Sequence, residues 1–577
     1  MNEPANPSKS ARAIPLWPAA LAVVVQWFAT YVPSLVIPST PIQFFGLVLG
    51  PGVGLLALYV WWWWTRHDRG TKILATVAPL LAFPPAVAVA DPSARMLIYL
   101  YGVPIFSALF LAWVAWGPER PRAKAVLVGL AVVAAGLGTL VRSDGVDGDF
   151  FPDPAWRWAP SAEDRLLEQG TDDGTAVADG VQGSLADAPW PGFRGARRDG
   201  VVTVPTSIST DWSAAPPELL WRRPVGPGWS SFSVAGGALF TQEQRGEEEL
   251  VSAYDAASGE PIWHFADAAR FWEPLAGAGP RATPTLEGDW LYALGATGVL
   301  NALDAKTGTS RWRRDIAADT GATTPEWGFA SSPLLIDGAD GGRQVVVHTG
   351  APSGKGLIAY DALSGEPRWT ASAGPLSYSS VQLVELAGRP QLLLPTGDGL
   401  SGYGLDGRPL WSHAWRVPGG ARVVQPAVVG DAVLLGTGFG MGMRRIDVTA
   451  KEASGFSIDE RWTSRRLKPY YNDFVVYGDH VYGFDGRILA CLDLETGELQ
   501  WKGGRYGNGQ LVLLETQGLL VVLTDRGQVT LVKASPDAFT ELARIEAIDG
   551  KTWNHPVYAD GVLYVRNAEQ MAAFRLP

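Results

Sequence analysis

One short phrase recurs four times in the C-terminal part of this chain. Each copy has an apolar residue, Asp, a Ser-Gly or Thr-Gly pair and a closing Trp. The copies are YDAASGEPIW (254–263), LDAKTGTSRW (303–312), YDALSGEPRW (360–369) and LDLETGELQW (492–501). Such a phrase predicts two strands joined by a tight turn, because Gly adopts the positive φ of the turn and the Asp side chain bonds the turn's N–H groups. Repetition at this length predicts a radial array of four-stranded blades, a β-propeller.

Weaker copies fill the gaps between the clear ones. YGLDGRPLW (403–411) shortens the turn, IDVTAKEASGFSIDERW (446–462) lengthens it, and VKASPDAFTELARI (532–545) has lost its Trp. The last strand, in MAAFRLP (571–577), has no hairpin partner after it, and the array begins with a lone strand in PELLWRRPVG (217–226). Pairing these two ends predicts an eighth blade. We therefore expect residues 189–577 to form an eight-bladed propeller whose closed ring leaves no exposed sheet edge.

Residues 1–142 are almost continuously apolar and predict a transmembrane helical domain. Five stretches are close to the ~20 residues that cross a bilayer: 14–37, 42–64, 73–90, 96–117 and 125–141. Three prolines interrupt the third stretch, which membrane helices tolerate when they pack against neighbours. A cleaved signal peptide is excluded by the length and number of the stretches.

Loop charges predict the orientation of these helices. The N-terminal tail and the second and fourth loops hold eight Lys or Arg, whereas the opposite side holds only Arg95 and Arg142. Basic loops stay in the cytoplasm. The N-terminus is therefore expected in the cytoplasm and the propeller in the periplasm, with the helices in a bacterial inner membrane.

Residues 143–188 predict an acidic linker. They contain eleven Asp or Glu and two Arg, a net charge of 2 − 11 = −9. Ser161 followed by Asp164 predicts a cap for one short helix, and Trp156 and Trp158 suit the membrane surface. The remaining residues, 189–577, hold 35 basic and 43 acidic residues, which argues against nucleic acid as a partner.

The sequence lacks the motifs of the common hydrolase, nucleotide-binding and metal-dependent enzymes. Its single cysteine, Cys491, lies in an apolar strand, and six scattered His provide no zinc or haem spacing. No phosphate-binding loop or nucleophile elbow is present. Repeated acidic residues at matching turn positions are expected to cap turns: Asp255, Asp304, Asp361, Asp447 and Asp493. No catalytic residue and no metal site is assigned, and whether the protein is an enzyme stays open.

The turn phrases resemble those of the pyrroloquinoline quinone-like propeller repeat proteins. PWPGFRGARRDGV (189–201), GPRATPTLEGDWLYALGATGVLNALDAKTG (279–308) and WGFASSPLL (327–335) support the resemblance, which covers about the last 390 residues. This superfamily includes quinoprotein alcohol and glucose dehydrogenases and the lipoprotein of the outer-membrane β-barrel assembly machinery. In such proteins the Trp of each turn packs between neighbouring blades.

The resemblance implies two possible functions. The first is a protein- or ligand-binding platform, in line with the compact propellers of the superfamily. The alternative is a dehydrogenase that oxidises a sugar or alcohol through pyrroloquinoline quinone with calcium and passes electrons to membrane quinone. Five membrane helices are similar to those of the membrane-bound glucose dehydrogenases, but the propeller here is much shorter, and their acidic calcium ligands have no matching positions.

Residues just before the first strand of each blade should converge on the central funnel. Aligned strand starts show an aromatic residue or Arg, followed by small or amide residues. Aromatic rings in this position would stack a flat ligand, and the two Arg would bind carboxylates. In the other interpretation these residues plug a narrow channel. The candidates are Trp229, Arg281, Trp327, Tyr378, Arg422, Asn472, Asp473, Trp553, Asn554 and His555. Asn472 and Asp473 are also oxygen ligands of the kind that calcium prefers.

Overall fold

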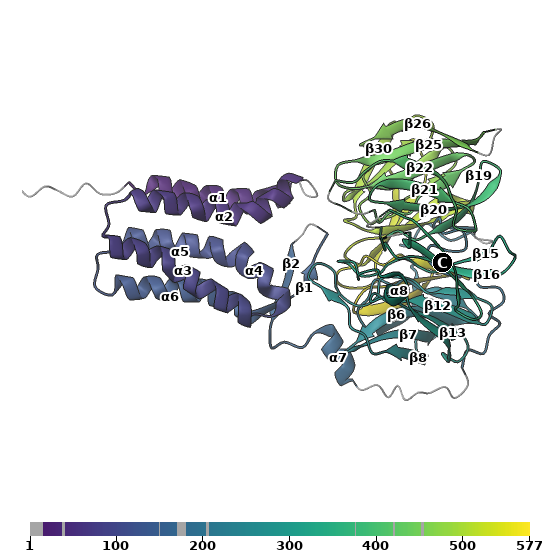
Figure 1. The fold of residues 1–577 in the computed structure, drawn as a ribbon, viewed down its shortest axis with the longest axis horizontal. Coiled ribbons are helices and arrows are strands. Elements are labelled where there is room, and N and C mark those ends of the chain that lie inside the picture. Colours follow the sequence, from purple (N-terminus) through teal and green to yellow (C-terminus); the bar gives the residue numbers. More distant parts are fainter. Residues whose placement is uncertain are drawn as a thin grey trace, which may run out of the picture. The chain divides into compact units, whose positions relative to one another are not determined.

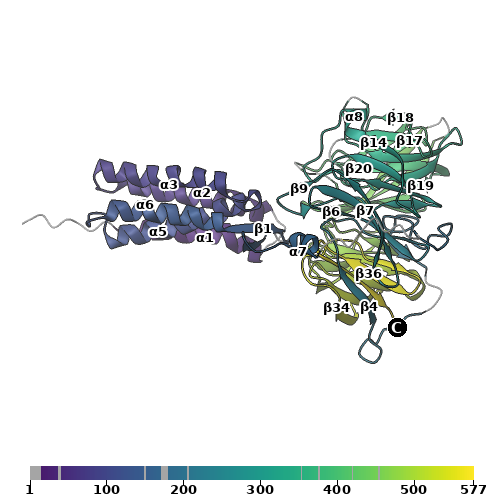
Figure 2. The same cartoon turned by 90° about the horizontal axis from the view of Figure 1, so that it is seen from below.

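The chain forms two compact units, residues 1–159 and 160–577, in a computed structural model. The structure describes residues 15–36, 41–148, 151–169, 180–203, 207–352, 354–374, 377–418, 420, 422–451 and 455–577. Figures 1 and 2 show the helices of the first unit and the blades of the second.

Five helical stretches of the first unit are long and apolar enough to cross a membrane: Trp17–Val36, Ile42–Trp64, Arg69–Val89, Pro92–Trp116 and Ala123–Leu140. They match the five predicted spans. The fourth is irregular and consists of η1 (Pro92–Ala94), α4 (Arg95–Leu97), a π-helical turn η2 (Ile98–Gly102) and α5 (Val103–Trp116). The others are α1 (Trp17–Val36), α2 (Pro41–Trp64), α3 (Arg69–Val89), and α6 (Ala123–Gly136) with η3 (Leu137–Leu140).

Helices α1 and α2 pack closely because α2 presents glycines at every fourth position. A Cβ on Gly46 would lie 2.3 Å from the carbonyl oxygen of Ala29, and one on Gly54 would lie 2.3 Å from Cβ of Gln26. Small residues allow this approach of two backbones in a membrane. The buried Gln26 side chain then donates to the carbonyl of Pro51, 2.7 Å away.

A β-hairpin follows the helices and is hydrogen-bonded to the start of the fourth span. Strands β1 (Val141–Val146) and β2 (Pro152–Trp156) pair antiparallel. The N–H of Ser143 donates to Ser93 Oγ at 2.9 Å. At the end of β2, Trp156 and Trp158 stack at 5.1 Å and are 56% and 68% exposed. The sequence predicted these residues as a spacer and did not predict the hairpin.

The second unit begins with helix α7 (Ala162–Glu168) and continues into the propeller. Ser161 and Asp164 form a reciprocal capping box at the start of α7. Glu163 on this helix binds Arg270 at 2.8 Å and the N–H of Gly246 at 2.8 Å, both in the first blade or the loop after it. The helix is therefore fixed to the propeller.

Eight antiparallel sheets form the blades, as the repeat predicted. The first four blades are β5 (Ser233–Ala235), β6 (Ala238–Arg245), β7 (Glu248–Asp255) and β8 (Pro261–Asp267); β11 (Thr285–Glu287), β12 (Trp290–Leu294), β13 (Val299–Asp304) and β14 (Ser310–Asp315); β15 (Leu334–Asp337), β16 (Arg343–His348), β17 (Leu357–Asp361) and β18 (Pro367–Ala371); and β19 (Gln382–Leu386), β20 (Arg389–Thr396), β21 (Gly399–Tyr403) and β22 (Pro409–Ala414). The last four are β23 (Ala427–Val429), β24 (Ala432–Thr437), β25 (Gly442–Ala450) and β26 (Phe456–Ser464); β27 (Val475–Tyr477), β28 (His480–Asp485), β29 (Ile488–Asp493) and β30 (Leu499–Arg505); β31 (Gln510–Leu514), β32 (Leu519–Leu523), β33 (Gln528–Lys533) and β34 (Glu541–Glu546); and β35 (Val557–Ala559), β36 (Val562–Arg566) and β37 (Gln570–Arg575) with β4 (Glu218–Pro224). Short elements join or flank them: β3 (Val201–Val202), β9 (Trp272–Glu273), β10 (Gly277–Ala278), α8 (Ile316–Thr320) and η4 (Glu515–Gln517).

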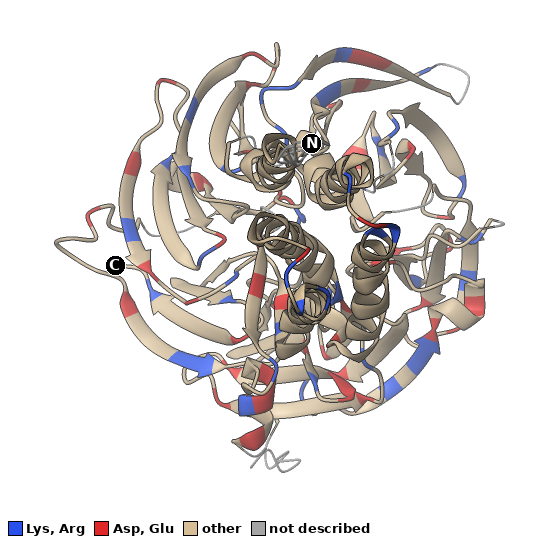
Figure 3. Cartoon of the chain, turned by 90° about the vertical axis from the view of Figure 1, so that its left-hand side faces the viewer, with Lys and Arg blue, Asp and Glu red and all other residues tan. Residues whose placement is uncertain are grey.

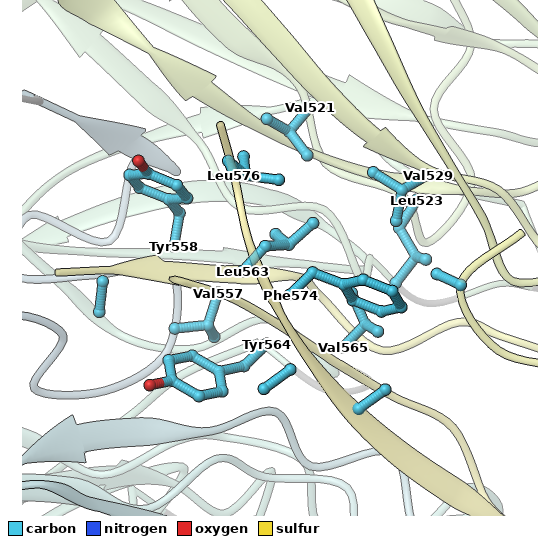
Figure 4. Close-up of a cluster of buried hydrophobic side chains, with 14 of the residues drawn as sticks. Val521, Leu523, Val529, Val557, Tyr558, Leu563, Tyr564, Val565, Phe574 and Leu576 are labelled. Carbon is cyan, nitrogen blue, oxygen red and sulfur yellow. The ribbon is translucent and has the colours of Figure 1, made fainter. Parts of the chain in front are cut away.

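The ring closes as predicted, because β4 pairs with β37. Ala573 lies opposite Trp221 in this antiparallel pair, which completes the sheet β35-β36-β37-β4. Figure 4 shows the apolar core between the seventh and eighth blades, where Leu523 and Val529 meet Val565 and Phe574. Closure is thus held by backbone pairing and by burial of these side chains.

The repeated turns act largely as the sequence predicted. Asp255 accepts bonds from the N–H groups of Ala257 and Ser258 at 3.1 and 2.8 Å, and Asp304, Asp361 and Asp493 cap their turns in the same way. Asp447 does not. It lies within β25, which the insertion extends into a long hairpin with β26, and it pairs with Arg445 and Arg461.

Figure 3 colours the charged residues of both units. The helices of the first unit contain few charged residues, whereas residues of both signs occur around the rim of the propeller. This distribution agrees with the balanced charge of residues 189–577.

Candidate functional site

A ring of polar residues surrounds the central channel of the propeller. Its members stand two residues before the first strand of each blade, and together we call them the channel ring. They are Ser231, Thr283, Ser332, Ser380, Gln425, Asp473, Asn508 and His555. The loops that contain them form the channel mouth.

Hydrogen bonds connect most members of the channel ring to the next blade. The N–H of one residue donates to the side chain of its neighbour: Ser231 to Thr283 (3.0 Å), Thr283 to Ser332 (3.0 Å), Ser332 to Ser380 (2.9 Å), Ser380 to Gln425 (3.2 Å) and Gln425 to Asp473 (2.6 Å). The circuit continues through Gln510, and Ser231 Oγ donates to the carbonyl of His555 at 2.7 Å. The small and amide residues at the strand starts therefore hold neighbouring blades together.

A segment of the chain that precedes the first blade crosses the channel, and we call residues 189–203 the channel segment. Its contacts reach seven of the eight blades. Arg194 donates to the carbonyl of Phe474 at 2.7 Å, and Arg198 donates to those of Ser332 and Val381 at 3.1 and 2.9 Å. Both arginines are buried and adopt positive φ values of 58° and 56°.

Sequence reasoning missed these two arginines. Arg is usually solvated, and nothing local in PWPGFRGARRDGV indicates burial. The one available signal is the pair of glycines around Phe193 and Arg194, which permits an unusual backbone path. Burial lowers the pKa of Arg198 to about 9, so the side chain stays charged at neutral pH while it binds backbone carbonyls of two blades.

Asp473 and His555, two of the predicted site residues, meet inside the channel. Asp473 Oδ2 lies 3.0 Å from His555 Nε2 and 3.5 Å from Arg194 Nη1. Burial raises the pKa of Asp473, but Arg194 and His555 outweigh it and the net pKa is lowered. Burial lowers the pKa of His555 against the opposing effect of Asp473. An ionised carboxylate thus links the channel segment to the sixth and eighth blades.

Aromatic side chains line the channel mouth beside this ring. Trp553 packs against Trp229 and against Tyr471, each at 4.9 Å between ring centroids. Lys551 Nζ lies over the Trp553 ring at 4.9 Å. These rings are only partly buried. They provide a half-open apolar surface with a cation beside it.

Trp327 and Tyr378 form a second stacked pair at the mouth. Their centroids are 4.8 Å apart, and the N–H of Trp327 donates to the Tyr378 hydroxyl at 3.2 Å. The predicted aromatic candidates therefore form two clusters and not one continuous platform.

The two predicted arginines have different surroundings. Arg281 donates to the carbonyls of Gly277 and Trp327 at 2.9 and 3.2 Å, and it pairs with Glu273 at 3.2 Å. Arg422 is fully buried, and among the described residues its guanidinium donates only to the carbonyl of Trp415. Burial lowers the pKa of each arginine to about 10.

Polar atoms without a partner gather at the channel mouth. They belong to five of the ten predicted site residues: Trp327 Nε1, Arg422 Nε and Nη1, Asn472 Nδ2, Trp553 Nε1 and Asn554 Oδ1. All but the last are donors. A mouth with unmet buried donors favours a ligand rich in acceptors, such as carboxylates or peptide carbonyls.

These residues do not fit a calcium–quinone centre. Asn472 uses its Oδ1 to accept the N–H of Tyr470 at 2.9 Å, and Asp473 is occupied by Gln425, His555 and Arg194. Within the described part of the chain, no group of three or more His, Cys, Asp or Glu is placed to hold a metal ion. Cys491 is buried, and burial raises its thiol pKa to about 12.

Comparison with known proteins agrees with the propeller. Residues 194–345 and 246–503 match the family model described as outer membrane protein assembly factor BamB. BamB of Burkholderia pseudomallei is 27% identical over 331 residues, which cover 52% of this chain and 85% of that protein. BamB of Yersinia pestis is 23% identical over 368 residues, which cover 61% of this chain and 77% of that protein.

Solved structures match this chain at low identity. BamB from Moraxella catarrhalis matches with a TM-score of 0.44 and 17% identity, over 62% of this chain and 97% of that one. The quinohemoprotein alcohol dehydrogenase ADHIIG from Pseudomonas putida HK5 matches with a TM-score of 0.46 and 14% identity, over 68% and 80%. Since the matched residues, 194–503, make up more than half of the chain, this protein belongs to the family of the outer membrane protein assembly factor BamB, within the pyrroloquinoline quinone-like propellers.

Proposed function

We propose that this protein is a membrane-anchored binding platform whose channel mouth holds a segment of another protein. The observation that carries the proposal is the set of unmet donors beside half-exposed aromatic rings, at Trp327 and Trp553 above all. Peptides supply carbonyl acceptors and apolar side chains together, so they match both features. The family name, an assembly factor for outer membrane proteins, supports a protein as the ligand.

We further propose that the domains divide as 1–142, 143–188 and 189–577, with the first in the inner membrane and the last in the periplasm. The basic residues of the cytoplasmic loops support this orientation. The stacked Trp156 and Trp158 support a membrane-surface position for the end of the hairpin, because amphipathic rings favour the interface.

Site-specific photocrosslinking in cells tests the platform. Benzoylphenylalanine replaces Trp553 at the mouth in one strain and Leu363 in another. Leu363 is 64% exposed and lies in the turn between β17 and β18, at the opposite end of its blade from the mouth loops. We expect discrete protein adducts from position 553 and none from position 363. Equal adduct patterns at the two positions would refute a mouth-specific platform.

The alternative, a quinone-dependent dehydrogenase, is tested with the same purified full-length protein. Pyrroloquinoline quinone and calcium are added together, and the melting temperature is measured. A ligand that binds only the folded state raises it by mass action. We expect no rise, because Asp473 and the Oδ1 atom of Asn472 already have partners. A rise that Trp553→Ala abolishes would favour the dehydrogenase over the platform.

A further inference from the structure

Arg422 is the one predicted funnel arginine whose charge is not balanced. It is completely buried, its Nη2 donates to the carbonyl of Trp415, and its Nε and Nη1 have no acceptor in the part of the chain that the structure describes. The guanidinium also lies over the Trp415 ring at 4.7 Å. The ring supports a cation but accepts none of the remaining N–H bonds.

The groups around Arg422 add positive charge. Arg444 lies over the same Trp415 ring at 4.5 Å, and its Nη1 is 3.1 Å from His413 Nε2. Glu460 pairs with Arg444 at 3.0 Å and is the carboxylate in this group. Among the described residues none forms an ion pair with Arg422, and the charge that shifts its pKa is that of Arg444.

Arg281, in the same set of loops at the channel mouth, has hydrogen-bond and ion-pair partners for its guanidinium. Its guanidinium donates to three carbonyls and to Glu273. A buried charge needs such partners, because burial without them is unfavourable. Arg422 is buried, but its guanidinium lacks a comparable set of carbonyl and carboxylate partners among the described residues.

The position of Arg422 places it at the channel mouth. Its carbonyl accepts the N–H of Tyr378 at 2.8 Å, and its backbone bridges to Ser377 in the loop before the fourth blade. Tyr378 in turn stacks on Trp327, whose Nε1 is also without a partner. The backbone of Arg422 and the ring of Trp327 therefore both contact Tyr378.

We propose that Arg422 is the core of an oxyanion site that takes a carboxylate, either free or on a peptide. A carboxylate provides the negative charge and the acceptor atoms that the guanidinium lacks, and arginine binds such groups with geometric preference. Arg444 adds to the positive field, which Glu460 partly offsets, whereas burial and the two arginines lower the pKa of His413. The peptide source rests on the proposed function, whereas the free-anion source does not.

Thermal melts of the full-length protein in detergent test the site. The probes are sodium acetate, tetraglutamate and tetraglutamine, each at one ionic strength kept constant with sodium chloride. The variants are Arg422→Gln, Arg422→Lys and, as a control, Arg466→Gln at an exposed arginine. We expect acetate to raise the melting temperature of the wild type and of Arg466→Gln. Arg422→Gln should bind acetate at least about tenfold more weakly, because it lacks the charge-assisted hydrogen bonds.

The outcomes separate the two sources of the carboxylate. Stabilisation by acetate and tetraglutamate, but not by tetraglutamine, supports a peptide carboxylate. Stabilisation by acetate alone supports the free-anion site and argues against the protein-binding platform at this position. An equal response of Arg422→Gln and wild type overturns the site. The site is also overturned if neither acetate nor tetraglutamate raises the melting temperature of the wild type, since Arg422 would then be only hydrated.

A second measurement does not depend on the folding of variants. Crystals of the wild-type protein are soaked in selenate, and the anomalous scattering of selenium is mapped. We expect a selenium peak within hydrogen-bond range of Arg422 Nε or Nη1. A map with selenate elsewhere and none at Arg422 contradicts the proposal.

Arg422→Lys should retain a weaker response in the melts, because an ammonium keeps the charge without the planar donor set.

Discussion

Gly308 in the second blade lies directly against the indole of Trp263 in the first blade. A Cβ at position 308 would come within 2.5 Å of Trp263 Cε3, and φ of Gly308 is +73°. The same relationship joins Gly259 to Trp221 at 2.7 Å. The Gly of each repeated phrase therefore accommodates the Trp of the copy before it, which is why the two residues recur together.

Substitution of this glycine is expected to destabilise the propeller. Gly308→Ala should lower the free energy of unfolding by roughly 2–4 kcal/mol, because backbone strain and overpacking against Trp263 add. The matched control is Gly288→Ala in the same blade, where φ is +53° but a Cβ meets nothing within 4 Å. It should cost only about 1 kcal/mol. Urea unfolding of both variants provides the measurement, and equal midpoints would show that the Trp contact is unimportant.

Arg281→Ala is expected to act on stability. Glu273, whose side chain is 6% exposed, would be left buried without its ion-pair partner. Breaking a buried pair costs about 3–5 kcal/mol, whereas Arg408→Ala, at an exposed arginine, should stay within ~0.5 kcal/mol. Thermal melts compare the two. A small loss of stability in Arg281→Ala would instead indicate that this side chain is solvated and available to contact a ligand in the funnel.

Trp553→Ala is expected to abolish binding of the partner protein while it lowers the stability of the fold only slightly. Its ring is partly exposed and packs on Trp229 and Tyr471. We expect the photocrosslinks from a second mouth position, Trp229, to disappear in this variant, while the melting temperature falls by only a few degrees. A large fall in melting temperature without any change in crosslinking would assign Trp553 to the core.

Glu249 should make stability depend on pH. Burial raises its pKa to about 7, which the hydrogen bond from the N–H of Ala296 opposes. Between about pH 4.5 and 7 the folded state therefore binds more protons than the unfolded state, and stability falls as pH rises through this window. Glu249→Gln should gain up to about 3 kcal/mol at pH 8 and little at pH 5. Melts at both pH values, with exposed Glu248→Gln as the control, check this; identical pH slopes in wild type and Glu249→Gln would contradict it.

Removal of residues 571–577 should open the ring. These residues contain most of β37, which pairs with β4 and with β36 and buries Phe574 and Leu576. Loss of the strand leaves two sheet edges unpaired. We expect the variant that lacks only this segment to aggregate or to be degraded rapidly by proteases. Protease resistance equal to that of the wild type would show that end-to-end closure does not stabilise the propeller.

Alkaline phosphatase fusions test the proposed orientation. The enzyme needs disulfides, which form outside the cytoplasm. A fusion after Arg142 should be active and one within residues 66–72 inactive. The reverse pattern would overturn the assignment of the N-terminus to the cytoplasm.

The fold was largely readable from local patterns. Asp, Gly and Trp at fixed offsets specify one hairpin, and seven such turns with two lone terminal strands lead to eight blades and to the pairing of β4 with β37. The five helices that are long and apolar enough to cross a membrane followed from the length of the apolar stretches. The polar positions before each first strand were also visible, because they repeat with the blades.

What these polar residues do was decided by the tertiary structure. Arg281 and Arg422 occupy similar places in the sequence pattern, yet only Arg281 finds a carboxylate, since Glu273 reaches it from a small hairpin between two blades. Arg194 and Arg198 look solvated in the sequence and are buried because the channel segment threads through a space that exists only once the ring has closed. A local pattern determines turns and strands, whereas burial and ion pairing depend on which distant residues the closed ring brings into contact.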